Sequence, residues 1–337
     1  MKLNNDEEGI NVTEKLTSDP AHPKLGIALS GGGFRASFYH LGVLAQLAQK
    51  GILKHVEVLS CVSGGSIIGA LYYLYVKRLL EHTLDRELSD QDYINLVAEM
   101  EAHFLQAVQK NLRMRTFLNP LKNLKMSLAN YSRSDHIGEL YDKYLYRGLI
   151  KGHAGPVRMR DLKIRPVGHT RDFHPLEHNQ YRTHKVPILL INATVLNNGH
   201  NWRFDASRMG EPPRDSAWDV QMDKNMRLQR PPSYDDIPNH ADFPLGTAVA
   251  ASACLPGIFP PLAVSGLYDD KIQVQLVDGG VHDNQGIQGL LDPQLGCTHF
   301  VISDASGQLN NEAHPSTVFH SVLGRSNQIM MERIREV

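Results

Sequence analysis

Cysteine is scarce in this chain, and the cysteines that occur follow no pattern. The 337 residues include three, Cys61, Cys254 and Cys297, which lie far apart and form no C-x-x-C pair. This spacing argues against a disulfide framework and against a structural zinc site built on cysteine. Separate thiols of this kind are typical of reduced cysteines in a cytoplasmic protein.

An excess of charge of one sign and a long apolar run are also absent. The 35 Lys and Arg residues against 36 Asp and Glu residues create no global field that would attract nucleic acid or an anionic membrane. The longest apolar stretch, 67–80, is interrupted by Gly69 and Lys77-Arg78 and is too short to span a bilayer. Residues 1–20 are polar and acidic, where an export signal would be basic and then apolar. We therefore expect a cytoplasmic protein that binds no nucleic acid and meets a membrane only peripherally.

Two successive strand-turn-helix units follow the acidic start of the chain. The first combines an apolar run at 25–30, a triple glycine and helical spacing over 35–50. The second combines strand formers at 56–61, a Ser-Gly-Gly turn and an apolar helix at 67–80. Because parallel strands need helical crossovers, this repetition predicts a parallel sheet covered by helices.

The remaining pattern extends the same architecture. Helices inserted between strands are expected over 91–149, interrupted at Pro120, and a further helix at 245–254. Further strands are expected at 187–195, 202–204, 273–277 and 300–302. The sequence therefore predicts a three-layer α/β/α domain with a mostly parallel central sheet, helical insertions, and a site at the carboxyl ends of the strands.

We expect two regions along the chain. Residues 1–22 form a polar extension, and residues 23–337 form one large domain. Within it, residues 153–242 are rich in loops, which predicts a lid or regulatory surface. His169, His174 and His178 of this stretch match no familiar ligand spacing, so we predict no metal or other cofactor. Nothing in the pattern indicates an oligomeric state.

Basic and apolar side chains alternate between Glu101 and Asp135, a stretch that contains no acidic residue. The basic residues are Lys110, Arg113, Arg115, Lys122, Lys125 and Arg133. Such a surface suits anionic lipid headgroups, although a solvated helix face over the core has the same pattern. Peripheral membrane binding through this basic stretch is our expectation, with the structural alternative left open.

Ser63 occupies a turn between a predicted strand and a predicted helix. This is the context of a nucleophile elbow, in which small residues such as Gly64 and Gly65 let the backbone turn sharply. The helix that follows directs its free N–H groups toward the serine oxygen. Taken alone, however, a Ser-Gly-Gly turn more often serves close packing of a helix on a sheet.

The triple glycine, Gly31-Gly32-Gly33, supports the elbow interpretation. Acyl transfer passes through a tetrahedral oxyanion, which needs backbone N–H donors unobstructed by side chains. Glycines at a helix N-terminus provide such donors, and Arg35 beside them is placed to bind a phosphate or to fix the loop. The same glycines satisfy a relaxed dinucleotide-binding pattern, which leaves a nucleotide- or anion-binding module as the alternative. That pattern requires an acidic residue at the end of the second strand, whereas Glu57 falls near its start.

Three blocks together resemble the patatin-like phospholipase family, which includes the catalytic domains of cytosolic phospholipases A2. They are Gly31-Gly-Gly-Phe-Arg35, Val62-Ser-Gly-Gly-Ser66 and Val277-Asp-Gly-Gly280, in the family's order. Weaker matches are Asn192-Ala-Thr194 and Ala251-Ser-Ala253, so the resemblance extends from about Leu25 to Asp304. The sequence departs from the family at Cys61, where the elbow motif usually has glycine.

The resemblance implies a serine acyl hydrolase that cleaves (lyso)phospholipids through an acyl-serine intermediate. In such an enzyme Ser63 is the nucleophile, Asp278 the proton acceptor, and Gly31 to Gly33 the oxyanion hole, with Gly279 in a supporting role. His282 is a candidate for a Ser-His-Asp triad, but the family pattern needs no histidine, which favours a Ser–Asp dyad. The rival carboxylates Asp283 and Asp304 are expected to fix a turn and to end a strand.

Overall fold

The computed structural model describes residues 23–118, 131–150, 155–169, 172–212, 233–237, 240–268, 272–306 and 311–318, with isolated positions at 152, 228 and between 321 and 329. The expected extension, residues 1–22, lies outside the described residues. No helix among them is long and apolar enough to cross a membrane.

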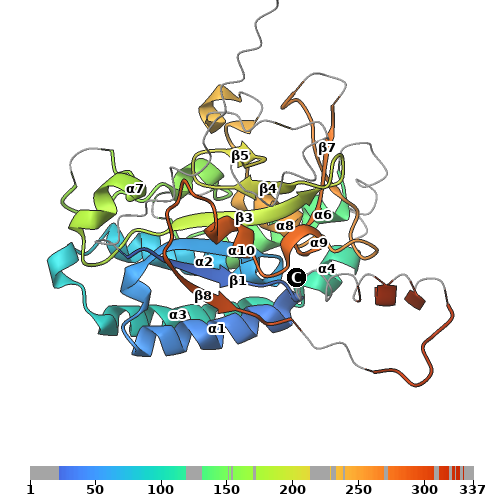
Figure 1. Ribbon diagram of the computed structural model, residues 1–337, viewed down its shortest axis with the longest axis horizontal. Coiled ribbons are helices and arrows are strands. Elements are labelled where there is room, and N and C mark those ends of the chain that lie inside the picture. Colours follow the sequence, from blue (N-terminus) through green and yellow to red (C-terminus); the bar gives the residue numbers. More distant parts are fainter. Residues whose placement is uncertain are drawn as a thin grey trace, which may run out of the picture.

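The described strands form one eight-stranded sheet with a parallel centre (Figure 1). The parallel strands lie in the order β8 (His299–Ser303), β1 (Leu25–Leu29), β2 (Val56–Val62) and β3 (Ile188–Val195). Antiparallel strands extend the sheet beyond β3: β4 (Asn201–Phe204), β5 (Met209–Gly210), β6 (Leu262–Val264) and β7 (Val274–Asp278). The predicted α/β fold with a mostly parallel central sheet is therefore confirmed.

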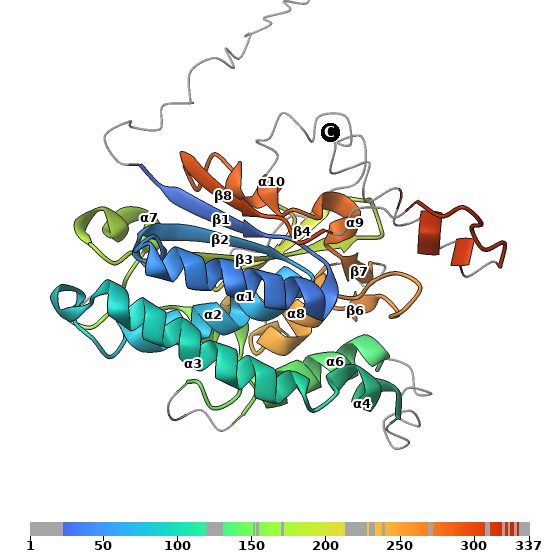
Figure 2. The same cartoon turned by 90° about the horizontal axis from the view of Figure 1, so that it is seen from below.

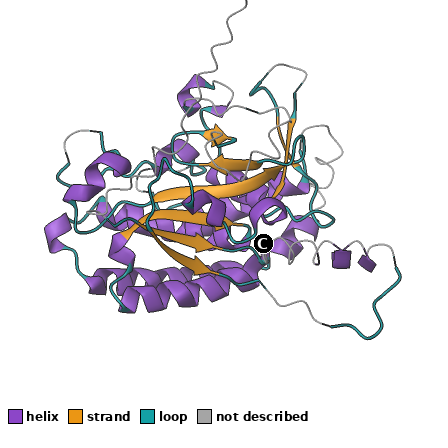
Figure 3. Cartoon of the chain, viewed as in Figure 1, coloured by secondary structure: helices purple, strands orange, loops and turns teal. Residues whose placement is uncertain are grey.

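Helices cover both faces of the sheet, as Figures 2 and 3 show. One face carries α1 (Gly33–Gln49), α2 (Gly64–Leu80), α3 (Asp90–Val108), α4 (Leu112–Leu118), α6 (Arg133–Tyr141) and α8 (Leu245–Ser252). The other face carries two short helices, α9 (Gly280–Asp283) and α10 (Ile287–Leu290). Helix α7 (Pro175–His178) lies at the end of the domain opposite α9.

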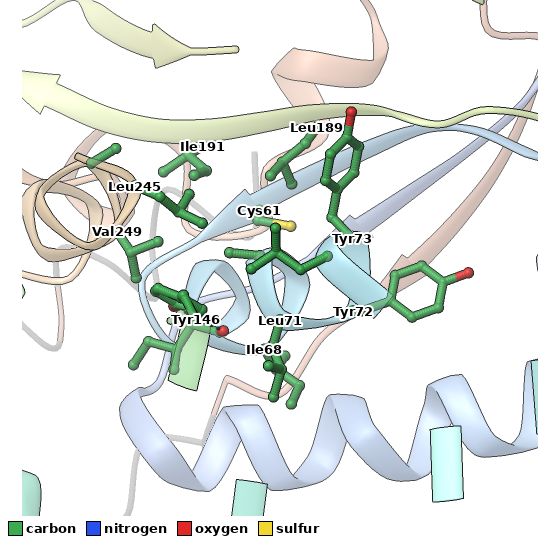
Figure 4. Close-up of a cluster of buried hydrophobic side chains, with 14 of the residues drawn as sticks. Cys61, Ile68, Leu71, Tyr72, Tyr73, Tyr146, Leu189, Ile191, Leu245 and Val249 are labelled. Atoms are coloured by element: carbon green, nitrogen blue, oxygen red, sulfur yellow. Dashed lines mark hydrogen bonds between the residues drawn. The ribbon is translucent and has the colours of Figure 1, made fainter. Parts of the chain in front are cut away.

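Two apolar cores follow from the alternation of side chains along the strands. Leu59 and Ile191 point into the larger core under α1 and α2, which Figure 4 shows in part. Val58 and Leu190, one residue earlier on each strand, pack against Leu290 of α10 in the smaller core. Helix α2 is buried over most of its surface because α1 and α3 cover the side that does not face the sheet. This explains why its sequence is apolar almost all round.

The structure adds detail to the sequence expectations. Strand β6 was not expected from its three residues, whose partner among the described strands is β7. The stretch 153–242 contains β3, β4 and β5 between loops, and its residues 213–227 lie outside the described part. A lid or regulatory surface in this stretch stays a prediction.

Candidate active site

Ser63 sits at the sharp turn between β2 and α2, in a backbone conformation that is rare for a side-chain-bearing residue. Its φ is 51° and its ψ is −115°. The surroundings hold this turn: the Ser63 N–H donates to Ser252 Oγ at 2.9 Å, and the Ser63 carbonyl accepts from Ser66 N–H at 2.9 Å. A strained serine held between a strand and a helix is the geometry of a nucleophile elbow.

The two glycines after Ser63 allow the elbow to touch the glycine loop Gly31–Gly33. A Cβ on Gly64 would collide with the backbone of Gly33, and a Cβ on Gly65 would collide with the backbone of Leu29. Both obstacles are main-chain atoms, which no rotamer change can move. The close approach of β1, the glycine loop and α2 therefore depends on glycine at both positions.

Strand pairing brings Asp278 to Ser63 from a position 215 residues away. Val62, the last residue of β2, pairs with Asn192 of β3, while Asp278, the last residue of β7, pairs with the next residue, Ala193. Because β4 occupies the other edge of β3, β2 and β7 lie on the same edge and meet end to end. The Ser63 hydroxyl consequently donates to Asp278 Oδ2 at 2.7 Å.

The Asp278 carboxylate is buried and partly satisfied by hydrogen bonds. Its exposed fraction is 3%. Gly280 N–H donates to its Oδ1 at 2.8 Å, and Thr194 Oγ donates to its main-chain carbonyl at 2.9 Å. Burial raises the pKa of Asp278 to about 6, against the opposing effect of the bonds from Ser63 and Gly280. Above that pH the carboxylate is charged and can accept a proton.

The glycine loop presents unused donors beside the serine. Gly32 and Gly33 have φ values of 137° and 65°, which glycine tolerates best. Gly31 N–H donates to the Asn284 carbonyl at 2.9 Å, so this donor is already occupied. Within the described part of the chain, the N–H groups of Gly32 and Gly33 have no acceptor. They lie at the N-terminus of α1, where the helix dipole favours negative charge.

The other candidates from the sequence have different partners. The two ring nitrogens of His282 bond to the Gly199 carbonyl and to Gln288 Oε1, at 3.1 and 2.8 Å, so this ring does not link Ser63 to Asp278. Asp283 accepts from three backbone N–H groups of the turn at 285–288, as expected. Asp304 follows the end of β8, also as expected, and accepts from Gln285 and from Ser306 N–H.

Arg35 and Gly279 lie where the sequence places them, next to the glycine loop and the carboxylate. The guanidinium of Arg35 is exposed and donates to the Ala305 carbonyl at 3.1 Å, which connects α1 to the segment after β8. A Cβ on Gly279 would collide with the Asn192 carbonyl oxygen. The structure thus shows a loop-fixing contact for Arg35 and a close main-chain approach at Gly279.

Sequence reasoning missed Ser252, the residue that holds the elbow from α8. Its fully buried hydroxyl accepts from Ser63 N–H, donates to the Asn192 carbonyl at 2.6 Å and bonds to Ser66 Oγ at 2.8 Å. Ser252 and Asn192 both belong to the weaker sequence matches described above. Those matches were the sequence signal that could have pointed to Ser252, but the contacts of its side chain follow only from the fold.

Cys61 fits its position because the facing helix has a glycine. A Cβ on Gly69 would collide with Cys61 Sγ, so the thiol fills the space that a side chain on α2 would otherwise take. Burial raises the pKa of the Cys61 thiol far above its ordinary value, which leaves it unreactive at neutral pH. The elbow therefore forms without the usual glycine at this position.

The described basic residues of the stretch 101–135 are exposed. Lys110, Arg115 and Arg133 face solvent, and the Arg115 guanidinium donates to the Lys110 carbonyl and lies over the Tyr144 ring. Lys122, Lys125 and the side chain of Arg113 lie outside the described residues. In the described part of the chain, no group of three or more His, Cys, Asp or Glu is placed to hold a metal ion.

Fold and site define an α/β protein in which an elbow serine bonds to a buried carboxylate beside a glycine loop. A family model for patatin-like phospholipases matches residues 27–291. Because this match covers most of the chain, the protein belongs to the patatin-like phospholipase family, a family of lipid acyl hydrolases.

Two solved structures are similar to the chain. VipD from Legionella pneumophila is 17% identical, with a TM-score of 0.33, over 79% of this chain and 47% of that one. Human GIVD cytosolic phospholipase A2 is 15% identical, with a TM-score of 0.29, over 56% of this chain and 24% of that one. This chain thus spans less than half the length of either protein. No curated protein sequence matches it.

Proposed function

We propose that the protein hydrolyses acyl esters of phospholipids or lysophospholipids through an acyl-Ser63 intermediate. The observation that carries the proposal is the 2.7 Å hydrogen bond from Ser63 Oγ to Asp278 Oδ2 at a strained elbow. The phospholipid class of substrate is supported by the family match. Phospholipase A and lysophospholipase activities both fit this chemistry.

The proposed acylation step uses Asp278 as general base. Its carboxylate takes the Ser63 hydroxyl proton while Oγ attacks the acyl carbonyl carbon, and Asp278 then returns the proton to the leaving alcohol. Water repeats the sequence on the acyl-serine and releases the fatty acid. A pKa of about 6 suits this role, because the carboxylate is charged at neutral pH yet more basic than an exposed aspartate.

We assign the oxyanion donors to Gly32 and Gly33, with Gly31 as the anchor of the loop. Gly31 was included in the predicted oxyanion hole, but its N–H is bound to the Asn284 carbonyl. Loss of one preorganised donor typically raises the activation barrier by about 3 kcal/mol. The loop therefore has to be held in place before substrate binds, and the contacts of Gly31 and Arg35 supply such restraints.

The decisive experiment is labelling with a fluorophosphonate followed by peptide mapping. The wild-type protein is expected to be labelled at Ser63, and Ser63→Ala to lose both labelling and ester hydrolysis. Asp278→Asn should lose at least about 100-fold in kcat, since general acid–base catalysis contributes about that much or more. His282→Gln serves as the matched control and should retain activity, because the His282 ring bonds elsewhere.

Results opposite to these would refute the nucleophile or the dyad, or would support the alternative function of an anion-binding module. Full ester hydrolysis by Ser63→Ala would refute the nucleophile, and full hydrolysis by Asp278→Asn would refute the dyad. An unlabelled wild-type protein that binds inorganic phosphate would instead support the anion-binding module. A lipidomic comparison of membranes treated with wild type and with Ser63→Ala would then show which lipids are consumed.

We further propose that the basic stretch holds the protein peripherally on anionic membranes from the cytoplasm. The support is the exposure of Lys110, Arg115 and Arg133 on and beside α4 and α6. The test is sedimentation with phosphatidylserine vesicles at increasing salt. Lys110→Glu combined with Arg115→Glu should weaken binding and reduce its salt dependence. Unchanged binding by this double variant would contradict the proposal.

A further inference from the structure

His40 is a fully buried polar side chain on the apolar face of α1. Its exposed fraction is zero, as are those of Ala36 and Leu44 on the same helix. A buried imidazole costs folding free energy unless its nitrogens are bonded. Both nitrogens of His40 are bonded, and their partners lie next to the proposed site.

The contacts of His40 define its tautomer. Nε2 lies 2.9 Å from the Ser30 carbonyl oxygen, which can only accept, so Nε2 carries the hydrogen. Nδ1 lies 2.7 Å from Ser303 Oγ at the end of β8. Burial lowers the pKa of His40, which keeps the ring neutral, and Nδ1 therefore accepts from the Ser303 hydroxyl.

The Ser30 carbonyl oxygen also accepts from Gly65 N–H, at 3.1 Å. Ser30 directly precedes the glycine loop, and Gly65 is the second residue after Ser63. One oxygen atom thus connects the segment that carries the proposed oxyanion donors to the helix that carries the proposed nucleophile. Ser37 lies one turn before His40 on α1, and its hydroxyl donates to the Gly64 carbonyl at 2.7 Å.

We propose that His40 is a positioning residue that sets the separation between the oxyanion loop and Ser63 through the Ser30 carbonyl. The inference rests on the proposed function. A ring that donates to Ser30 and is itself held by Ser303 fixes the direction of this carbonyl, and with it the direction of the adjoining Gly31 peptide. Without the ring, the bonds that the described residues make to this peptide are those from Gly65 N–H to the Ser30 oxygen and from Gly31 N–H to the Asn284 carbonyl. The restraint from α1 is then lost, so the loop can shift and its donors no longer meet the developing oxyanion.

The test compares His40→Leu with His40→Gln. Glutamine offers an N–H donor to Ser30 and a carbonyl acceptor to Ser303, whereas leucine fills the space without either. Active sites are counted by fluorophosphonate labelling taken to completion. The kcat for a soluble ester is then expressed per labelled site, and KM is measured in the same assay. A misplacement of about 1 Å can lower a rate about 100-fold, so kcat of His40→Leu should fall by that order with little change in KM. His40→Gln should recover most of the loss.

The matched control is His184→Leu, which removes another buried imidazole. His184 bonds to Asp85, beyond the far end of α2 from Ser63, and stacks on Tyr93. This variant should lower the thermal midpoint and leave kcat per labelled site unchanged. A wild-type kcat per labelled site in His40→Leu would overturn the role of His40. Failure of the wild-type protein to be labelled would instead overturn the proposed function, which keeps the two outcomes distinct.

Discussion

Replacing Asp278 by asparagine is expected to stabilise the protein while it removes the proposed base. Burial raises the pKa of this carboxyl from 3.8 to about 6 in the folded state. The folded protein therefore binds the proton more tightly than the unfolded chain, and stability falls as the pH rises through the interval between these values. One pKa unit corresponds to about 1.4 kcal/mol, so the buried charge costs about 3 kcal/mol at pH 8.

Asparagine avoids this cost and keeps the contacts. Its amide oxygen can accept from Gly280 N–H, as Asp278 Oδ1 does, and its NH2 group can donate to Ser63 Oγ. We therefore expect Asp278→Asn to exceed the wild type in free energy of unfolding by up to about 3 kcal/mol at pH 8. The gain should fall to about half of this at pH 5 and nearly vanish below pH 4.

Guanidinium chloride unfolding of both proteins at pH 8, 5 and 4 measures this difference. Comparing the two proteins at each pH cancels the titration of all other groups that behave alike in both. A variant less stable than the wild type at pH 8 would refute the reasoning, and so would a stability difference that does not change with pH. The expected pattern would show that the site is maintained at the expense of stability.

Three further predictions concern the site and its supports. The kcat/KM for a soluble ester should rise about tenfold per pH unit below pH 6 and level off above it, because Asp278 must be ionised to act as a base; a midpoint near pH 4 would contradict this. Gly69→Ala should cost about 1–3 kcal/mol in unfolding free energy, because the new Cβ collides with Cys61 Sγ. Adding Cys61→Ala to this variant should restore most of the lost stability. A double variant whose loss equals the sum of the two single losses would exclude the collision. Ser252→Ala leaves the buried Ser63 N–H without its partner. This variant should therefore lose about 1–3 kcal/mol in unfolding free energy and have a lower kcat. A wild-type unfolding free energy together with a wild-type kcat would show that Ser252 does not hold the elbow.

Most of the sheet was predictable from local patterns. The runs that became β1, β2, β3 and β7 are apolar and short, and the helices α1 and α2 follow glycine turns. A strand at 202–204 was also expected, and it corresponds to β4. Strand β6 was not, because its three residues show no pattern of their own and acquire strand geometry only by pairing with β7. Ser63 and Asp278 became the candidate site residues because three motif blocks coincide in order.

The sequence by itself determined the elbow, the glycine loop and the carboxylate as candidates, since turns, glycines and strand ends are local properties of the chain. It left open whether Asp278 or His282 serves Ser63, and which glycine N–H groups are free. The tertiary structure shows the hydrogen-bond partners of these side chains and of the Gly31 N–H. Pairing of β2 and β7 to neighbouring residues of β3 brings Asp278 to Ser63, while the His282 ring bonds elsewhere and the Gly31 N–H bonds to Asn284. The bonds from Ser63 to Asp278 and from His282 to Gly199 join residues 215 and 83 positions apart, and no local pattern encodes contacts between residues so distant in the sequence.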